Sequence, residues 1–377
     1  MKIGIIGTRG IPNRYGGFEQ FAEHFSVRMA ARGHSVAVYT SHRHPYKADQ
    51  YKGVQLIRCY DPERVAGTAG QFLYDLNCIR NSRGRHFDII LQLGYTSSTV
   101  WSWLYPASSI LATNMDGLEW SRAKYNSLTR YFLQFAEQWG VRYSHYLIAD
   151  STAIQEYLLR KYNAPSAYVA YGADVYEPEA EAEKILSDYS LTAGDYDLWI
   201  ARFEPENSIE QLLKAYPRGY DRKLALVGNY RHTALGRRLF KQYRSATNIR
   251  FMGAIYDQRQ LNTLRYYSRL YIHGHTAGGT NPSLLEAMGC SALIVARDNL
   301  FNRRVSGDDA FYFKGIPDLH SLLSTEINKA DYGHWQNNNR KKIENNYNWE
   351  YITEKIESLF LQWKYEKETD VCLAKPV

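Results

Sequence analysis

The sequence has few cysteines and no long apolar run, and both shortages exclude whole classes of protein. Four cysteines occur among 377 residues, and none forms a Cys-x-x-Cys pair. This spacing argues against a zinc site or a disulfide framework and favours a reducing compartment. The stretch from Ile89 to Met115 is uncharged, but its many polar residues and Pro106 make it a poor membrane span. We therefore expect a soluble or peripheral protein.

Standard nucleotide-binding motifs are also missing. The loop 7–19 is rich in glycine, but it lacks the Gly-Lys-Ser/Thr of a Walker A loop and does not fit Gly-x-Gly-x-x-Gly. It follows the apolar segment 2–7, which we interpret as a first β-strand and not as a signal peptide. Its glycines allow close backbone approach to a ligand, or they only make turns. Arg9 is a candidate phosphate ligand, and Gly16 and Gly17 begin the next helix.

The charge is basic and unevenly spread. The net charge of +7 divides into 19 Lys/Arg against 13 Asp/Glu in residues 1–175, and 27 against 26 in the remainder. No nucleic-acid motif accompanies the basic half, so an anionic membrane surface is the better partner, and plain solubility is the alternative. Residues 120–146 fit a headgroup surface or an ordinary core-facing helix. Their aromatic and basic members include Trp120, Arg122, Lys124, Tyr125, Arg130, Tyr131, Phe132, Trp139, Arg142 and Tyr143.

Strand-like runs alternate with helical patterns in two series, and the acidic segment 177–183 lies between them, where a linker would belong. The expected strands are 2–7, 35–39, 88–93, 110–113, 146–149, 168–171, 198–201, 223–227, 270–273, 292–296 and 310–313. Such alternation is typical of doubly wound α/β domains. We predict a first domain over 1–176 and a second over 190–350. A C-terminal helix over 351–377 could pack back on the first domain.

The most informative stretch is 273–289, with the sequence His-Gly-His-Thr-Ala-Gly-Gly-Thr-Asn-Pro-Ser-Leu-Leu-Glu-Ala-Met-Gly. It follows an apolar strand, crosses a glycine turn, and enters a helix that Thr280 or Asn281 can cap before a proline. A helix start offers backbone N–H groups and a positive dipole end to a phosphate. Glu286, further into the helix, could accept hydrogen bonds from two neighbouring sugar hydroxyls. The stretch therefore predicts a nucleotide-sugar site.

Two charged residues elsewhere follow predicted strands. Arg202 could hold a diphosphate through charge-assisted hydrogen bonds, and a surface salt bridge to Glu204 or Glu206 is the alternative. Asp116 lies at the carboxyl edge of a strand, where catalytic or sugar-binding groups occur in open α/β sheets. Asp116 could orient an acceptor hydroxyl or hold a donor hydroxyl, and the alternative is a turn residue before Gly117.

We expect no metal. Asp195-Tyr196-Asp197 has the spacing of a DxD metal motif, but it precedes a strand and so lies at the end opposite to the predicted site. His273 and His275 have no third ligand at useful spacing.

These motifs together resemble GT-B glycosyltransferases of the large retaining family 4, over nearly the whole chain. The resemblance is closest to the bacterial rhamnosyltransferase-like subgroup. It rests on the loop 7–19, on Asp-Gly-Leu-Glu-Trp at 116–120, on Pro-Glu-Asn at 205–207 and on the stretch 273–288. It implies an α/β fold of two Rossmann-like doubly wound domains facing a central cleft.

The resemblance also implies where the donor binds. The family places the nucleotide and diphosphate on the second domain, which carries over to Arg202, Gly278, Gly279, Thr280, Asn281 and Glu286. Glu286 matches the second glutamate of an E-x7-E pattern, which is assigned to the ribose. Gly278 replaces the first glutamate, so backbone N–H groups of Gly279 and Thr280 would contact the donor sugar. Asn207 replaces a phosphate-binding lysine, and an arginine in Phe-Asn-Arg-Arg-Val at 301–305 stands where the subgroup has glutamate.

We therefore expect a retaining, metal-independent glycosyltransferase whose only small-molecule requirement is a nucleoside diphosphate sugar. The resemblance points to dTDP-L-rhamnose as donor and to a saccharide acceptor on polyprenyl pyrophosphate, in bacterial cell-surface polysaccharide synthesis at the inner face of the plasma membrane. Arg202 and Glu286 would act on the donor, and Asp116, Gly16 and Gly17 would align the acceptor. The alternatives are a nucleotide-sugar epimerase of the same fold and a nonenzymatic glycan- or membrane-binding protein.

Overall fold

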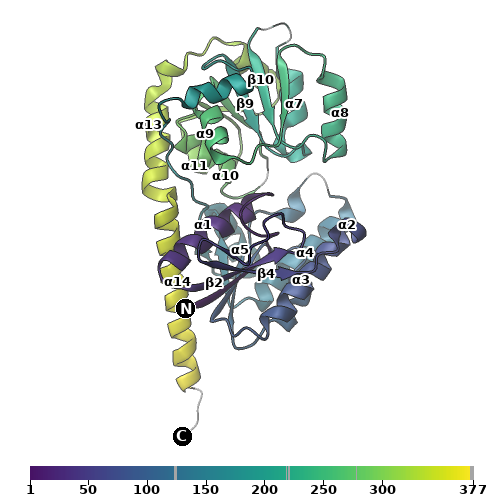
Figure 1. The fold of residues 1–377 in the computed structure, drawn as a ribbon, viewed down its shortest axis with the longest axis vertical. Helices are drawn as coiled ribbons and strands as arrows, with labels where there is room; N and C mark the ends of the chain where they lie inside the picture. Colours follow the sequence, from purple (N-terminus) through teal and green to yellow (C-terminus); the bar gives the residue numbers. More distant parts are fainter. Residues whose placement is uncertain (123–124, 218, 220, 277, 374–377) are drawn as a thin grey trace. The chain divides into compact units, whose positions relative to one another are not determined.

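The computed structural model describes residues 1–122, 125–217, 219, 221–276 and 278–373. The chain forms two compact units, each built on one sheet (Figure 1). The first comprises residues 1–120, 126–171 and 349–377, and the second comprises 121–125 and 172–348. Two residues of the predicted motifs, Lys124 and Ala277, lie outside the described residues.

The sheet of the first unit has eight strands in the order β3-β4-β2-β1-β5-β6-β7-β8. All neighbours run parallel except β3, which is antiparallel to β4. The strands are β1 Lys2–Ile6, β2 Ser35–Ser41, β3 Gln50–Tyr51, β4 Val54–Cys59, β5 Ile89–Leu93, β6 Ile110–Asn114, β7 Tyr146–Ala149 and β8 Ala167–Tyr168. The helices are α1 Gly17–Ala31, α2 Glu63–Ala66, α3 Thr68–Ser82, η1 Thr99–Leu104, η2 Glu119–Ser121, α4 Ser127–Tyr143, α5 Thr152–Tyr162 and α14 Trp349–Leu373.

The sheet of the second unit has six parallel strands in the order β11-β10-β9-β12-β13-β14. They are β9 Tyr196–Ile200, β10 Lys223–Val227, β11 Ile249–Gly253, β12 Leu270–His273, β13 Ile294–Arg297 and β14 Phe311–Phe313. The helices are η3 Ala182–Lys184, α6 Ile185–Asp188, η4 Pro205–Asn207, α7 Ile209–Ala215, α8 Ala234–Tyr243, α9 Gln258–Tyr267, α10 Pro282–Gly289, α11 Leu300–Ser306, α12 Ile316–Ser324, η5 Lys329–Tyr332, α13 Gly333–Lys342 and the π-helical turn η6 Ile343–Tyr347. Two apolar clusters involve residues of its strands and helices.

In each sheet the chain adds strands outward from a central strand on one side, and then returns and adds strands on the other side. The strand order therefore reverses once, between β1 and β5 in the first unit and between β9 and β12 in the second. Neighbouring strands at these points send their connections to opposite sides, which separates the loops at their carboxyl ends. Open parallel sheets bind ligands outside the carboxyl ends of the strands at such a switch point. The fold is therefore the expected pair of Rossmann-like α/β domains, with one candidate site position on each sheet.

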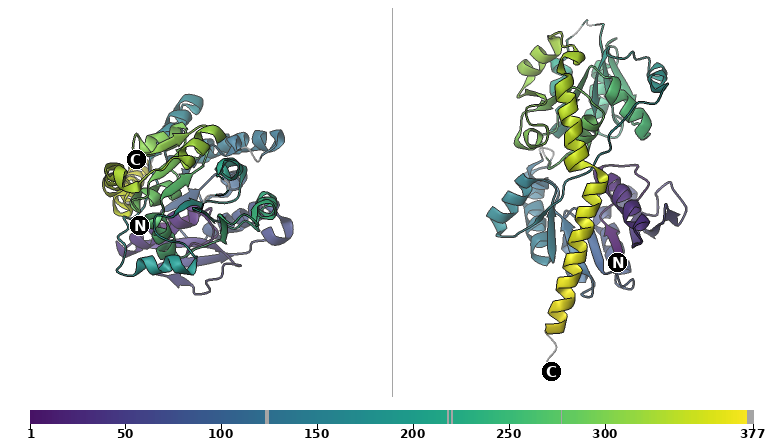
Figure 2. Two further views of the ribbon diagram at one scale, coloured as in Figure 1. Left: turned by 90° about the horizontal axis from the view of Figure 1, so that it is seen from above. Right: turned by 90° about the vertical axis from the view of Figure 1, so that its left-hand side faces the viewer.

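The long C-terminal helix α14 packs on α1 within the first unit (Figures 1 and 2). The rings of Trp349 and His24 stack with centroids 4.5 Å apart. Arg32, at the end of α1, forms ion pairs with Glu357 and with two further glutamates of α14. Ring stacking and these ion pairs together attach α14 to α1.

Three strands were missed by the sequence prediction, which treated the regions between the expected strands as helical or looped. These are β3 and β4 in the first unit and β11 in the second. The strands β3 and β11 lie at the edges of their sheets, and β4 is next to the edge strand β3. Polar residues such as Arg58 in β4 and Arg250 in β11 interrupt the apolar run. The predicted strand 168–171 was also displaced, because β8 comprises only Ala167–Tyr168.

Candidate functional site

Two loops leave the sheet of the second unit at its switch point. The β9 loop comprises residues 201–208, and the β12 loop comprises 274–281. A Cβ atom on Gly274 would lie 2.3 Å from the Asn207 carbonyl oxygen, so only glycine permits this approach. The Ser208 hydroxyl donates to the Gly274 carbonyl at 2.7 Å, and the Thr276 amide donates to the Glu206 carbonyl at 2.9 Å. The two loops are therefore joined by hydrogen bonds at Ser208–Gly274 and Glu206–Thr276.

The β12 loop leads into α10 through the predicted cap. The Asn281 side chain accepts from the Ser283 amide at 3.0 Å, and Pro282 occupies the first turn. The Asn281 carbonyl accepts from the next two amides, at 3.0 and 3.2 Å. Asn281 occupies the first amides of the helix, so these amides are not available to an anion. The helix can still attract an anion through its dipole, and the N–H donors have to come from the glycine turn before the helix. That turn needs glycine at 278, whose φ is +123°.

Arg202 stands at the exit of β9. Its carbonyl accepts a hydrogen bond from the Asn207 amide group at 2.8 Å, which fixes the backbone of the turn. The side chain is exposed and, among the described residues, makes no ion pair. The alternative of a salt bridge to Glu204 or Glu206 is thus not seen, and the guanidinium is available to an anionic ligand.

Glu286 lies on α10 and is 9% exposed. Its carboxylate forms an ion pair with Arg265 of α9, which is 1% exposed, and accepts from the Gln258 side chain at 3.1 Å. Burial is the largest influence and lowers the pKa of Arg265, but the charge of Glu286 and the further contributions of Tyr271 and Cys290 together outweigh it, so the pKa is raised. Each carboxylate oxygen has two acceptor positions, so Glu286 can bind these partners and still accept from sugar hydroxyls.

Sequence reasoning missed Arg265 and Gln258, because neither belongs to a motif. Both lie on α9, more than twenty residues before Glu286. Only the packing of α9 on α10 brings them to the carboxylate.

A column of three rings stands beside α10. Tyr271 and His273 stack at 6.4 Å between centroids, and His273 and His275 at 4.4 Å. The residues alternate along the chain, which places them on one face. Burial lowers the pKa of His273 to about 3, so this imidazole is neutral. The sequence had considered the two histidines only as metal ligands.

Arg122 adds a second guanidinium to the same region. Segment 121–125 lies between β6 and β7 of the first sheet in the sequence but belongs to the second compact unit. Arg122 forms an ion pair with Glu206 at 3.5 Å, and Glu206 is 3% exposed. The same Glu206 accepts from the β12 loop through its main chain, so Arg122 is tied to that loop through one residue.

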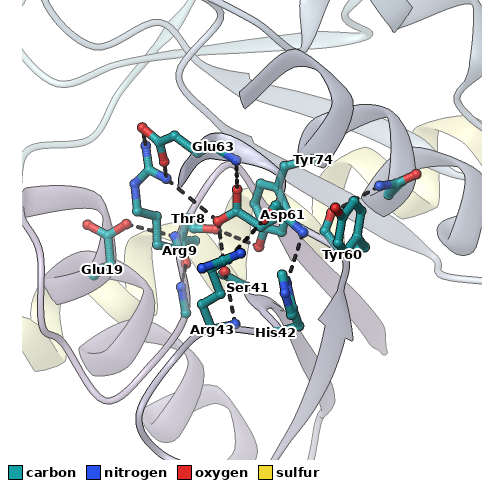
Figure 3. A network of polar contacts seen from close by, with 12 residues as sticks. Thr8, Arg9, Glu19, Ser41, His42, Arg43, Tyr60, Asp61, Glu63 and Tyr74 are labelled. Carbon is teal, nitrogen blue, oxygen red and sulfur yellow. Dashed lines mark hydrogen bonds and ion pairs between the residues drawn. The ribbon is translucent and has the colours of Figure 1, made fainter. Parts of the chain in front are cut away.

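Arg9, the predicted phosphate ligand of the first unit, has partners within its own unit (Figure 3). Its guanidinium forms a two-pronged ion pair with Glu63 and lies 3.9 Å from Asp61. Its amide donates to the buried Glu19 at 2.8 Å. Figure 3 shows these groups gathered around the loop after β1. The geometry supports a role for Arg9 in fixing the loop.

Gly16 and Gly17 lie where α1 begins, with Gly16 as its N-cap. Asp116 follows β6 in a left-handed conformation with φ of +29°, and its amide donates to the Asn114 side chain at 3.0 Å. Burial, and then the charges of Asp116 and Asp150, raise the pKa of the Tyr171 hydroxyl well above its usual value. Asp116 therefore belongs to an acidic group at the carboxyl edge of the first sheet.

Asp197 of the DxD-like segment is buried in β9 and pairs with Arg269 through two hydrogen bonds of 2.8 Å. Within the described ranges, no cluster of three or more His, Cys, Asp or Glu could hold a metal ion. Within the same ranges, no helix combines the length and apolarity that crossing a membrane requires.

Two family models match separate parts of the chain. Residues 195–316 match "Glycosyl transferases group 1", and residues 1–174 match a domain of unknown function, DUF1972. The first match includes both site loops, α10 and the pair Arg265–Glu286. No curated protein sequence matches the chain.

Solved structures match nearly the whole chain in fold. A sucrose-phosphate synthase from Thermosynechococcus elongatus superposes with a TM-score of 0.77 at 17% identity, over 96% of this chain and 98% of that one. The Anabaena protein HepE, in complex with UDP and glucose, gives 0.73 at 16%, over 96% and 99%. WaaG, a glycosyltransferase involved in lipopolysaccharide biosynthesis, gives 0.69 at 14%, over 96% and 99%. The fold and the group 1 domain together support a GT-B glycosyltransferase.

Proposed function

We propose that this protein transfers a sugar from a nucleoside diphosphate sugar to a saccharide hydroxyl, with retention of configuration and without a metal. The observation that carries the proposal is the grouping of three elements at one switch point. These are the exposed Arg202, the capped start of α10 and the buried Glu286 held by Arg265. They are suited to a diphosphate and a ribose, and they lie within the group 1 match.

The chemistry follows from where charge develops. The bond between the anomeric carbon and the β-phosphate oxygen breaks, and negative charge grows on the departing diphosphate. The Arg202 guanidinium and the positive end of α10 stabilise that charge, which is commonly the largest contribution such a site makes. The acceptor oxygen then bonds to the same face of the anomeric carbon, and its proton passes to the departing phosphate. Asp116, Gly16 and Gly17 are the proposed acceptor-aligning residues.

The donor we propose is dTDP-L-rhamnose, and the acceptor is a saccharide carried by a polyprenyl pyrophosphate in surface polysaccharide synthesis. Support for this choice is the subgroup resemblance of the loop 7–19 and the stretch 273–288. Gly278, in place of a glutamate, leaves backbone N–H groups of Gly279 and Thr280 as donor-sugar contacts. UDP-sugars are the main rival, because HepE was solved with UDP and glucose.

A thermal-shift screen of the full chain tests the proposal. Ligands that bind only the folded protein raise its Tm by mass action. We expect dTDP and dTDP-rhamnose to raise the Tm more than UDP, GDP and their sugars. A preference for UDP or GDP compounds would overturn the donor and keep the activity. No shift with any nucleotide would overturn the nucleotide site. Sugar consumption without an acceptor would favour an epimerase.

A membrane contact of the first unit is a second part of the proposal. On α4, Leu128, Tyr131 and Phe135 are 79%, 71% and 42% exposed. They are spaced three and four residues apart and so share one face. Arg130 and Arg142 are exposed on the same helix, while its single acidic residue, Glu137, is buried. Aromatic side chains with cations and no exposed carboxylate suit an anionic lipid surface.

Flotation with vesicles tests this contact. We expect the protein to bind vesicles of equal parts phosphatidylcholine and phosphatidylglycerol at low salt, and not pure phosphatidylcholine. Replacing Leu128, Tyr131 and Phe135 by serine should abolish binding. The matched control is Leu159→Ser on α5, where the leucine is 52% exposed. Equal binding by the triple variant would exclude this face.

A further inference from the structure

The imidazole of His275 has an unusual environment for a histidine in a loop. Its Nδ1 atom is buried and, within the described ranges, has no hydrogen-bond partner. A buried polar atom without a partner costs about 1–3 kcal/mol, and each such atom in a folded protein calls for an explanation. Ligand binding is one explanation, because the partner then arrives with the ligand.

One contact orients the His275 ring, and two sets of hydrogen bonds fix the backbone that carries it. It stacks on His273 at 4.4 Å with an angle of 15° between the planes. The His275 carbonyl accepts from the side chains of Asn299 and Asn302, at 2.9 and 3.2 Å. The next residue, Thr276, donates through its amide and its hydroxyl to the Glu206 carbonyl. A group fixed in this way loses little further entropy on binding a ligand.

The charges around the ring are positive. Burial, and then His273, Arg202 and Arg122, lower the pKa of His275 well below its usual value. The ring is therefore a neutral imidazole with one N–H donor, and it stands near two guanidinium groups. Arg202 is exposed, and Arg122 is anchored to Glu206 at 3.5 Å. Two cations beside a neutral donor suit a polyvalent anion.

We infer that His275 is a binding residue for the donor: its neutral imidazole donates a hydrogen bond to the diphosphate, alongside the guanidinium groups of Arg202 and Arg122. The inference rests on the proposed function. Position 278, three residues further on, is Gly278, which has no side chain to offer. His275 supplies a side-chain donor from the same loop, and the stack on His273 fixes its direction.

The test compares two substitutions with opposite consequences. His275→Phe keeps a flat ring on His273 but removes the donor, whereas His275→Asn keeps a neutral N–H donor and loses the stack. Hydrogen bonds to charged groups are worth about 1.5–3 kcal/mol, or roughly 10- to 100-fold in affinity. By calorimetry with UDP and dTDP, we expect His275→Phe to weaken binding by at least about tenfold, and His275→Asn by less.

Three outcomes are separable. If the histidine only packs, His275→Phe binds better than His275→Asn, and the inference is overturned. The inference is also overturned if the wild type binds UDP or dTDP and His275→Phe binds equally well, although the proposed function then survives. If the wild type binds neither nucleotide, the proposed function fails first. His320→Phe is the control, because this exposed histidine of α12 contacts the Ala215 carbonyl in the same unit.

Discussion

Replacing Arg265 by methionine should be among the most damaging single changes in the second unit. Methionine has a similar length but no charge, so the Glu286 carboxylate would lose its ion-pair partner. Both residues are largely buried, with side-chain exposures of 1% and 11%. Removing one partner of a buried pair costs about 3–5 kcal/mol, because the remaining charge is left uncompensated. In a unit of this size each kcal/mol lowers the Tm by roughly 2–4 °C, so we expect a fall of about 6–20 °C.

Calorimetric unfolding of the wild type, Arg265→Met, Glu286→Gln and the double variant measures this effect. The double variant buries no unpaired charge and should recover most of the lost stability, with a coupling energy of at least about 1 kcal/mol. It should still fail to bind nucleotide, because the carboxylate that we propose for the ribose is gone. A loss below about 1 kcal/mol in Arg265→Met would refute the buried-pair reasoning. Nucleotide affinity unchanged in Glu286→Gln would remove Glu286 from the site.

Three further predictions concern pH, the loop contact and metal. Burial raises the pKa of Asp75 to about 7. The native state keeps this proton up to that pH, whereas the unfolded chain releases it near pH 4. The free energy of unfolding should therefore fall by up to about 4 kcal/mol from pH 4 to 7. Asp75→Asn should remove that slope in denaturant titrations, and an unchanged slope would contradict it. Gly274→Ala places a Cβ 2.3 Å from the Asn207 carbonyl oxygen and should lower the free energy of unfolding by about 1–3 kcal/mol. It should also weaken nucleotide binding measured by calorimetry. An unchanged affinity would show that the contact between the loops does not affect the site. A chelator should leave transfer activity intact, and loss of activity that added Mg²⁺ restores would contradict a metal-independent mechanism.

The sequence was most informative where local chemistry determines structure. The cap at Asn281, the proline after it and the glycine start of α1 depend on residues adjacent in the chain. Their geometry could be predicted because a capping side chain bonds to an amide two or three residues away. The alternation of strands and helices likewise predicted two α/β sheets. Edge strands such as β11 were missed, because one flank has no neighbour and their apolar pattern is weak.

Contacts between distant segments could not be predicted. The partner of Glu286 is Arg265, on a helix with no motif, and the partner of Glu206 is Arg122, more than eighty residues earlier. Nothing in a linear pattern distinguishes these arginines from others in a chain with 46 basic residues. The packing of helices and loops selects them, and that selection depends on the whole fold.

Arg9 and Arg202 show why such contacts decide function. In the sequence both arginines lie within two residues of the end of an expected strand, and both were predicted to meet phosphate. In the structure Arg9 lies between Glu63 and Asp61, and burying an arginine requires such compensation. Arg202 stays exposed and, in the part of the chain that the structure describes, makes no ion pair. An arginine just after a strand is placed where it could reach a ligand. The carboxylates around it determine whether its charge is already paired within the protein or can pair with that ligand. An anion should therefore compete with Glu63 at Arg9 but meet no competitor at Arg202, so Arg202→Ala should weaken nucleotide binding far more than Arg9→Ala.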